Sequence, residues 1–108
     1  MSKENRISVQ EYQVIIKEKK THILLDVRET VQFNICSLPN SIHIPLALLS
    51  KRKNELSLNS TIYVICRLGN DSQLAVEMLK NEGYETVKDI IGGLLAWHNE
   101  IDPSFPSY

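Results

Sequence analysis

Short apolar runs alternate with segments of helical spacing along most of this 108-residue chain. The runs typical of strands cover residues 23–27, 41–44, 61–66 and 86–90, and helical spacing covers residues 30–35, 46–53, 72–82 and 94–99. This alternation favours a parallel sheet, because parallel neighbours need a crossover connection, which is usually a helix. We therefore expect one α/β domain with a central, mostly parallel sheet of about five strands and helices on both faces.

A further helix is predicted to open near the N-terminus. Ser8 can cap this helix, and Glu11 stands three residues on, in the reciprocal position of a capping box. The helical period then predicts a buried stripe at Tyr12, Ile15 and Ile16.

The helix predicted over residues 72–82 has apolar residues at i, i+1, i+4 and i+5, and Gly83 follows it where a left-handed cap is favoured. The apolar residues are Leu74, Ala75, Met78 and Leu79. After the last predicted strand, Gly92 and Gly93 allow a tight turn into the next helix. We expect the tail, residues 102–108, to pack loosely.

Composition narrows the class of protein. Twelve Lys and Arg against 13 Asp and Glu give a net charge of -1, so no global basic field attracts nucleic acid or an anionic membrane. Apolar runs such as residues 62–66 are far shorter than the roughly 20 residues that span a bilayer. Residues 1–10 lack the apolar core of a secretory signal, and the two cysteines form neither a disulfide framework nor a Cys-x-x-Cys pair. A cytoplasmic location is therefore expected.

Cys66 is the strongest candidate for chemistry. It ends a predicted buried strand and is followed by a short loop and then a helix. In parallel α/β sheets, ligands bind at the carboxyl ends of the strands, where such loops lie. The loop residues are Arg67, Leu68, Gly69, Asn70, Asp71 and Ser72. Their backbone N–H groups can turn inward as a cradle for an anion, Gly69 allows a positive φ, and the helix N-terminus favours a thiolate. The alternative is a cysteine that only fills space at a strand end.

Three other segments carry motifs. Residues 25–29 read Leu-Asp-Val-Arg-Glu, residues 40–45 read Asn-Ser-Ile-His-Ile-Pro, and residues 92–97 read Gly-Gly-Leu-Leu-Ala-Trp. Together with the Cys66 loop, these segments resemble the rhodanese-like sulfurtransferases over nearly the whole chain. The resemblance implies a rhodanese-like fold, with Cys66 in the catalytic position. In such enzymes the cysteine takes up a sulfane sulfur as a persulfide and passes it to an acceptor nucleophile.

One position departs from the family pattern. Many single-domain members resemble Cys-x-x-Gly-x-Arg, whereas the sixth residue of this loop is Asp71. A carboxylate there repels thiosulfate and other small dianions, so we expect a protein-bound persulfide as the donor.

The loop and the tail also resemble one branch of the family, the C-terminal rhodanese-like part of two-part adenylating and sulfur-transferring enzymes. This resemblance implies an E1-like domain in cis, a ubiquitin-like sulfur carrier as acceptor and a cysteine desulfurase as donor. It connects the chain with molybdenum cofactor synthesis and with tRNA wobble uridine thiolation, without direct contact to nucleic acid or membrane. The chain has no Gly-rich nucleotide loop and no Cys-x-x-Cys pair, so we expect no cofactor in this domain, and ATP and zinc would belong to the E1-like part.

Two other functions stay open. A cysteine phosphatase has a Cys-x5-Arg loop that encloses phosphate, but the sixth residue after Cys66 is Ser72. A catalytically inactive rhodanese-like module would use the fold only as an interaction surface, and Cys66 argues against it.

The remaining candidates have structural interpretations. Cys36 could act as a resolving thiol, although a passive cysteine is the simpler assignment. Asp26 and Arg28 are expected to form a hydrogen-bonded structural pair. His22, His43 and His98 lack metal-binding spacing, Trp97 is expected in the core, and Lys51, Arg52 and Lys53 are expected on a solvated helix face unless they dock an acidic carrier.

Overall fold

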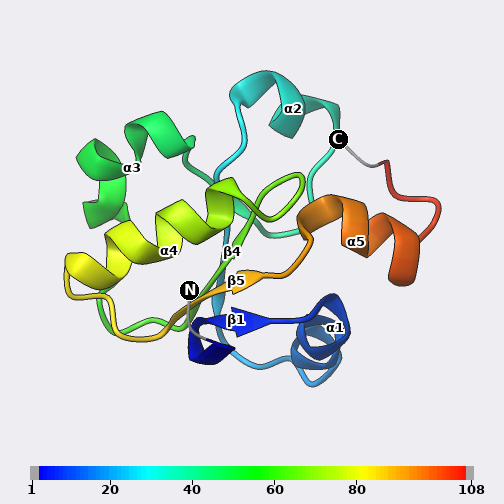
Figure 1. Cartoon of the computed structure of the whole chain (residues 1–108), viewed down its shortest axis with the longest axis horizontal. Helices are drawn as coiled ribbons and strands as arrows, with labels where there is room; N and C mark the ends of the chain where they lie inside the picture. Colours follow the sequence, from blue (N-terminus) through cyan, green and yellow to red (C-terminus); the bar gives the residue numbers. More distant parts are fainter. Residues whose placement is uncertain (1–2, 107–108) are drawn as a thin grey trace.

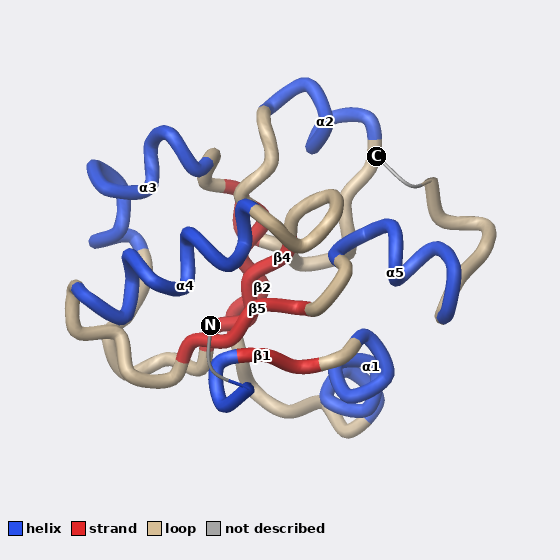
Figure 2. Tube along the Cα trace, viewed as in Figure 1, coloured by secondary structure: helices blue, strands red, loops and turns tan. Residues whose placement is uncertain are grey.

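The computed structural model describes residues 3–106. Five strands form one sheet in the order β1 (Arg6–Ile7), β5 (Val87–Ile90), β4 (Ile62–Ile65), β2 (Ile23–Asp26) and β3 (Ile42–His43). Every pairing within this sheet is parallel, which confirms the predicted architecture. Figure 2 shows the strands crossing the middle of the molecule with helices around them.

Helices cover both faces of the sheet (Figure 1). They are α1 (Val9–Lys17), α2 (Thr30–Ile35), α3 (Leu46–Arg52), α4 (Asp71–Asn81) and α5 (Gly93–Glu100), with 3-10 turns at η1 (Lys3–Asn5) and η2 (Lys53–Glu55). Successive side chains of a strand point to opposite faces of the sheet, so the core consists of two apolar clusters. Leu25 and Val64 pack with α3 and α4 on one face, whereas Leu24 and Ile65 pack with α1 and α5 on the other. Sheet and helices thus form a three-layer domain.

The strand β1 has no counterpart among the predicted strands. It is only two residues long, so no alternation of polar and apolar residues could reveal it. Its place is fixed by pairing with β5 and by an ion pair between Arg6 and the fully buried Asp89, 3.0 Å apart. Long-range contacts therefore create this edge strand.

Two helical stripes differ from prediction. In α1, Tyr12 is buried and Ile15 packs against the core, but Ile16 is 42% exposed because it lies at the edge of the helix face that contacts the core. In α4, Leu74 is 55% exposed. The buried positions of that helix are instead Ser72, Ala75, Val76 and Leu79, which follow the i, i+3, i+4, i+7 spacing of a single helix face.

The C-terminal tail is held more firmly than expected. Phe105 packs against the apolar cluster of α1 and α5, and its carbonyl oxygen lies 2.6 Å from Nδ1 of His98. These contacts correct the expectation of loose packing for the described part of the tail; residues 107–108 of that prediction lie outside the described residues. No helix within residues 3–106 is long and apolar enough to cross a membrane.

Candidate active site

The Cys66 loop follows β4, the central strand of the sheet. Cys66 is 4% exposed, and its Sγ accepts hydrogen bonds from the backbone N–H groups of Gly69, at 3.0 Å, and Ser72, at 3.3 Å. The Ser72 Oγ lies 3.4 Å from the same sulfur. The loop therefore curls around Sγ, as the cradle hypothesis requires, and two of its N–H groups are directed at the sulfur.

Local sequence explains this curl. Gly69 has a φ of +91°, a conformation that costs side-chain-bearing residues free energy. The Gln73 side chain donates a 2.7 Å hydrogen bond back to the Gly69 carbonyl oxygen. Because α4 begins at Asp71, the sulfur also lies at the positive end of that helix, which stabilises negative charge.

The start of α5 supports the loop from behind. Leu94 donates its N–H to the Cys66 carbonyl oxygen at 2.9 Å, and Leu95 donates to that of Arg67 at 3.0 Å. A Cβ on Gly93 would lie 2.3 Å from the Cys66 carbonyl oxygen. The sequence predicted only a tight turn at Gly92 and Gly93. The close approach of the start of α5 to the Cys66 loop is a second reason for glycine here. In the sequence, the Gly-Gly motif is the feature that could have indicated this contact.

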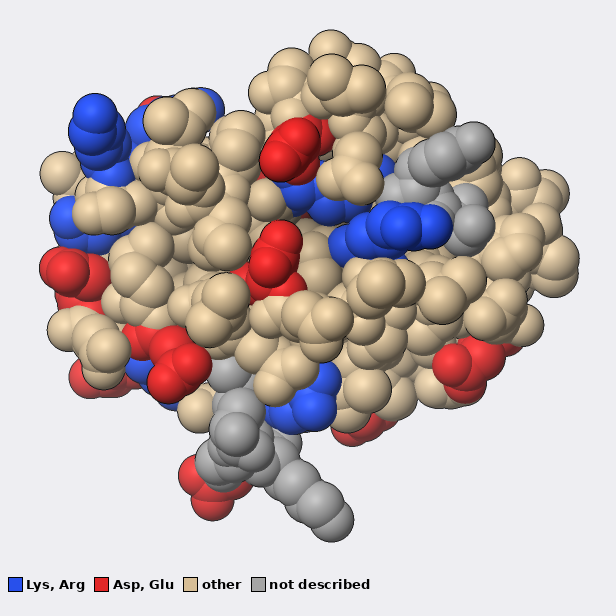
Figure 3. Space-filling view, turned by 45° about the horizontal axis from the view of Figure 1, so that its top comes forward, with Lys and Arg blue, Asp and Glu red and all other residues tan. Residues whose placement is uncertain are grey.

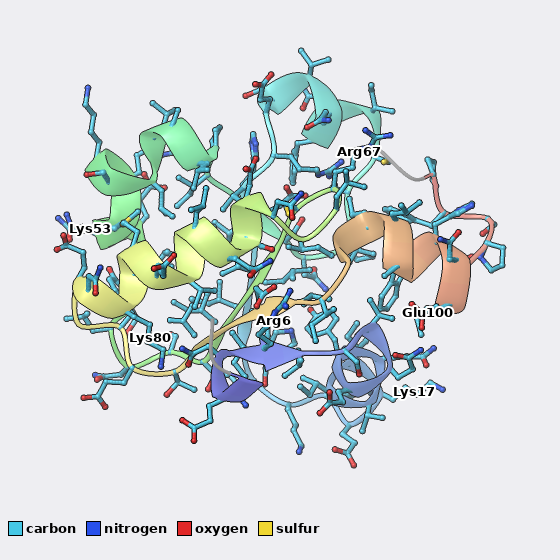
Figure 4. The ribbon with its side chains drawn as sticks, viewed as in Figure 1. Arg6, Lys17, Lys53, Arg67, Lys80 and Glu100 are labelled. Atoms are coloured by element: carbon cyan, nitrogen blue, oxygen red, sulfur yellow. The ribbon has the colours of Figure 1, made fainter. Side chains whose placement is uncertain are left out.

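The loop opens into a cleft of about 780 Å³ at the carboxyl ends of three strands. The segments after β2, β3 and β4 form its walls, which include Val27, Arg28, Glu29, Pro45, Leu46, Ala47 and the loop from Cys66 to Asp71 except Gly69. Figure 4 shows Arg67 between α2 and α5, beside this loop. Arg67, Leu68, Asn70 and Asp71 are exposed, whereas Cys66, Gly69 and Ser72 are buried.

Charge of both signs surrounds the cleft. Its lining includes Glu29, Arg67 and Asp71, all exposed, and Figure 3 shows acidic and basic side chains around a hollow on this side of the molecule. The loop supplies no arginine at the sixth position after Cys66, where a cysteine phosphatase needs one, because buried Ser72 stands there. This geometry disfavours a phosphate dianion.

Arg28 and Asp26 form the structural pair expected from sequence. Both side chains are 1% exposed, with Nη2 of Arg28 2.7 Å from Oδ2 of Asp26. The guanidinium also donates to the Cys36 carbonyl oxygen at 2.6 Å, which holds the end of α2 against the sheet. His43 contacts the Arg28 carbonyl oxygen at 2.8 Å and stacks on Phe33.

The other candidates lie outside the site. Cys36 is a free, half-buried thiol whose Sγ contacts Arg28 and the Pro106 carbonyl oxygen, so no contact supports a resolving role. His22 lies 2.8 Å from the hydroxyl of Tyr12, and burial raises the pKa of Tyr12, which keeps the phenol protonated. Residues 3–106 contain no cluster of three potential metal ligands.

Trp97 is 8% exposed and belongs to the core, as predicted. Arg52 pairs with Glu55 at 2.8 Å, and Lys53 lies 4.0 Å from Glu82. Lys51 is exposed. The basic run is therefore a solvated face with local ion pairs, in agreement with the structural interpretation.

Fold and site together define an α/β domain in which a loop that directs backbone N–H groups at a buried cysteine sulfur lies at the carboxyl edge of a parallel sheet. A model of the family "Rhodanese-like domain" matches residues 8–100, and the chain belongs to this family of sulfurtransferases.

Curated relatives show which members of the rhodanese-like family this chain is similar to. The adenylyltransferase and sulfurtransferase MOCS3 of Arabidopsis thaliana is 44% identical over 121 residues, covering 97% of this chain and 26% of the relative. The adenylyltransferase and sulfurtransferase UBA4 of Yarrowia lipolytica is 50% identical over 111 residues, which cover 100% of this chain and 27% of the relative. The match corresponds to the C-terminal rhodanese domain of such proteins. The chain spans about a quarter of the length of these relatives.

Solved structures agree with the fold. A rhodanese-related protein from Thermoplasma volcanium has a TM-score of 0.80 and 32% identity, covering 94% of this chain and 95% of that one. The reduced CoADR-RHD protein of Bacillus anthracis has a TM-score of 0.82 and 30% identity, covering 96% of this chain and 18% of that one.

Proposed function

We propose that this chain carries sulfane sulfur as a persulfide on Cys66 and passes it to the adenylated C-terminus of a ubiquitin-like sulfur carrier. One observation supports this most directly: Gly69 and Ser72 direct N–H groups at Sγ, at the N-terminus of α4 and beneath an open cleft. The same groups would stabilise an anionic sulfur during uptake and release. The outer sulfur displaces AMP from the carrier, and a thiol reductant cleaves the resulting acyl disulfide, so the product on the carrier is a thiocarboxylate.

The partners follow from the relatives. Proteins named both adenylyltransferase and sulfurtransferase imply that an E1-like part in cis activates the carrier while the rhodanese-like part supplies sulfur. We assign ATP and zinc to that part and no cofactor to this domain. A cysteine desulfurase is the proposed donor, in the cytoplasm, and the pathways are molybdopterin synthesis, tRNA wobble uridine thiolation or both.

The charge of the cleft supports a protein donor over thiosulfate. Asp71 and Glu29 are exposed in its lining, and carboxylates repel a small dianion. A persulfide at the end of a protein segment carries less charge, and its approach is guided by contacts beyond the sulfur.

The test is incubation of the chain with a cysteine desulfurase and cysteine, followed by intact-mass and peptide mass spectrometry. We expect one added, reducible sulfur atom on Cys66, lost in Cys66→Ala and retained in Cys36→Ala, which is the matched control. Adenylated carrier and a thiol reductant are then added: the outer sulfur displaces AMP from the carrier, and the thiol reduces the resulting acyl disulfide to a thiocarboxylate and free Cys66. A sulfur on Cys36, or on neither cysteine, would contradict the proposal and favour an inactive interaction module.

A further inference from the structure

The hydroxyl of Ser72 is buried against the sulfur of Cys66. Ser72 is the second residue of α4 and has an exposed fraction of 0%. Its Oγ lies 3.4 Å from Cys66 Sγ, and its own backbone N–H points at the same sulfur over 3.3 Å. One residue thus brings two hydrogen-bonding groups to the atom at which the proposed chemistry takes place.

Packing alone does not explain a hydroxyl at this position. The same face of α4 carries Ala75, Val76 and Leu79, and each of these side chains is fully buried. Alanine has a higher helix propensity than serine, and burial of a hydroxyl costs free energy that its hydrogen bond only offsets. A methyl side chain would suit this face at least as well, so the hydroxyl points to a role at the sulfur.

We infer that the Ser72 hydroxyl stabilises Cys66 Sγ as the leaving group when sulfur is handed over. The inference rests on the proposed function only in that Cys66 carries the persulfide, and it concerns hand-over to a nucleophile such as a thiolate or cyanide, which attacks the outer sulfur. A bond forms between the acceptor and the outer sulfur, the S–S bond breaks, and its electron pair stays on Sγ. The Ser72 proton stays on its oxygen and hydrogen-bonds the sulfur.

The hydrogen bond strengthens as the reaction proceeds. In the free thiol, Sγ donates to Ser72 Oγ; once Sγ carries negative charge, the hydroxyl turns and donates instead. The inner sulfur of a persulfide is a weak acceptor and a thiolate is a much stronger one. An interaction that is stronger in the transition state than in the ground state lowers the barrier, as donors of an oxyanion hole do.

The experiment separates sulfur release from sulfur uptake. The 108-residue chain is converted to its persulfide with inorganic polysulfide, freed of excess reagent and mixed with cyanide, which removes the outer sulfur as thiocyanate. Wild type, Ser72→Ala and Ser72→Thr are compared in this single turnover. We expect release to slow about ten- to a hundredfold in Ser72→Ala, with little slowing in Ser72→Thr. Urea unfolding should show no loss of stability in Ser72→Ala.

The rate of sulfur uptake by Cys66 shows whether the Ser72→Ala substitution has displaced the loop. Sγ attacks as the thiolate and its hydrogen bond weakens as it does so. At a pH at which the uptake rate no longer rises with pH, Ser72→Ala should therefore take up sulfur at least as fast as wild type. Equal release rates for wild type and Ser72→Ala would overturn the inference while leaving the proposed function intact. Equal slowing of uptake and release would overturn it too, because a displaced loop impairs both. A wild-type chain that forms no persulfide on Cys66, either with polysulfide or with a cysteine desulfurase and cysteine, would instead refute the proposed function.

Discussion

Leu94 donates its backbone N–H to the carbonyl oxygen of Cys66 over 2.9 Å, so the first turn of α5 holds the loop cysteine from behind. This contact requires the two segments to lie close together, and Gly93 allows it because a Cβ there would lie 2.3 Å from the same oxygen. The position of Sγ therefore depends on a residue 27 positions away in sequence, the difference between 93 and 66.

Gly93→Ala should displace the loop and impair sulfur uptake. Its φ of +60° adds strain of about 1–2 kcal/mol for a residue with a Cβ, beyond the clash. We expect persulfide formation on Cys66, measured by mass spectrometry over time, to slow by about tenfold or more.

Gly83→Ala is the matched control for this substitution. Gly83 also has a positive φ, +95°, but a Cβ there would meet only Leu58, at 3.9 Å, far from the sulfur in the fold. This variant should lose stability in urea unfolding through backbone strain alone, without a clash, yet take up sulfur at the wild-type rate. Equal slowing of uptake in both variants would show that strain in general, and not the contact with Cys66, is responsible.

Asp71→Arg should make thiosulfate a better donor. The substitution replaces an exposed negative charge at the cleft with a positive one, which attracts the dianion. We expect thiocyanate formation from thiosulfate and cyanide to rise by about tenfold, with the gain reduced at high salt.

Glu77→Arg makes the same change of charge on the exposed side of α4, outside the cleft lining. Its thiosulfate activity should stay near that of wild type. If Glu77→Arg gained as much as Asp71→Arg, net charge and not the charge at the cleft would control donor choice.

Asp26→Asn should destabilise the fold strongly. It leaves the guanidinium of Arg28 buried without its carboxylate partner, and breaking such a pair costs about 3–5 kcal/mol. Urea unfolding measures this loss. A double variant, Asp26→Leu with Arg28→Met, should recover much of the stability because it removes both charges of the pair and leaves neither buried without its partner. A loss well below 1 kcal/mol in Asp26→Asn would contradict the structural role.

Glu11→Gln should remove a pH-dependent part of the stability. The pKa of Glu11 is lowered from its ordinary 4.5, first by its hydrogen bond from the backbone N–H of Ser8 and then by the Ser8 side chain. A carboxyl with a lowered folded pKa stabilises the fold above about pH 4.5, and this contribution is lost as the pH falls through the folded value.

Unfolding free energies of wild type and Glu11→Gln should therefore differ at neutral pH and converge as the pH falls below the folded pKa of Glu11. A glutamine still accepts the Ser8 N–H bond, so only the charge is tested. Ser8→Ala, which removes the reciprocal bond, should cost about 1 kcal/mol at neutral pH. A difference between wild type and Glu11→Gln that persisted unchanged at low pH would contradict this account.

Local patterns predicted much of the fold. The Ser8 capping box is formed, Gly83 has its positive φ, and helix α2 has the predicted bounds, residues 30–35. The other predicted strands and helices match to within a residue or two at their ends, where hydrogen bonds within a segment no longer decide the boundary. These features depend on interactions between residues that are close in sequence, so they can be predicted from the sequence alone.

The sequence by itself determined the alternation of strands and helices, the cysteine at the end of β4 and the glycine that curls its loop, because each depends on neighbouring residues. Only the tertiary structure decided which residues meet across the fold. It placed β1 beside β5, brought Gly93 against Cys66, joined three strand ends into one cleft and turned the Ser72 hydroxyl toward the sulfur. Such contacts depend on how helices pack on a sheet, which no short window of sequence contains.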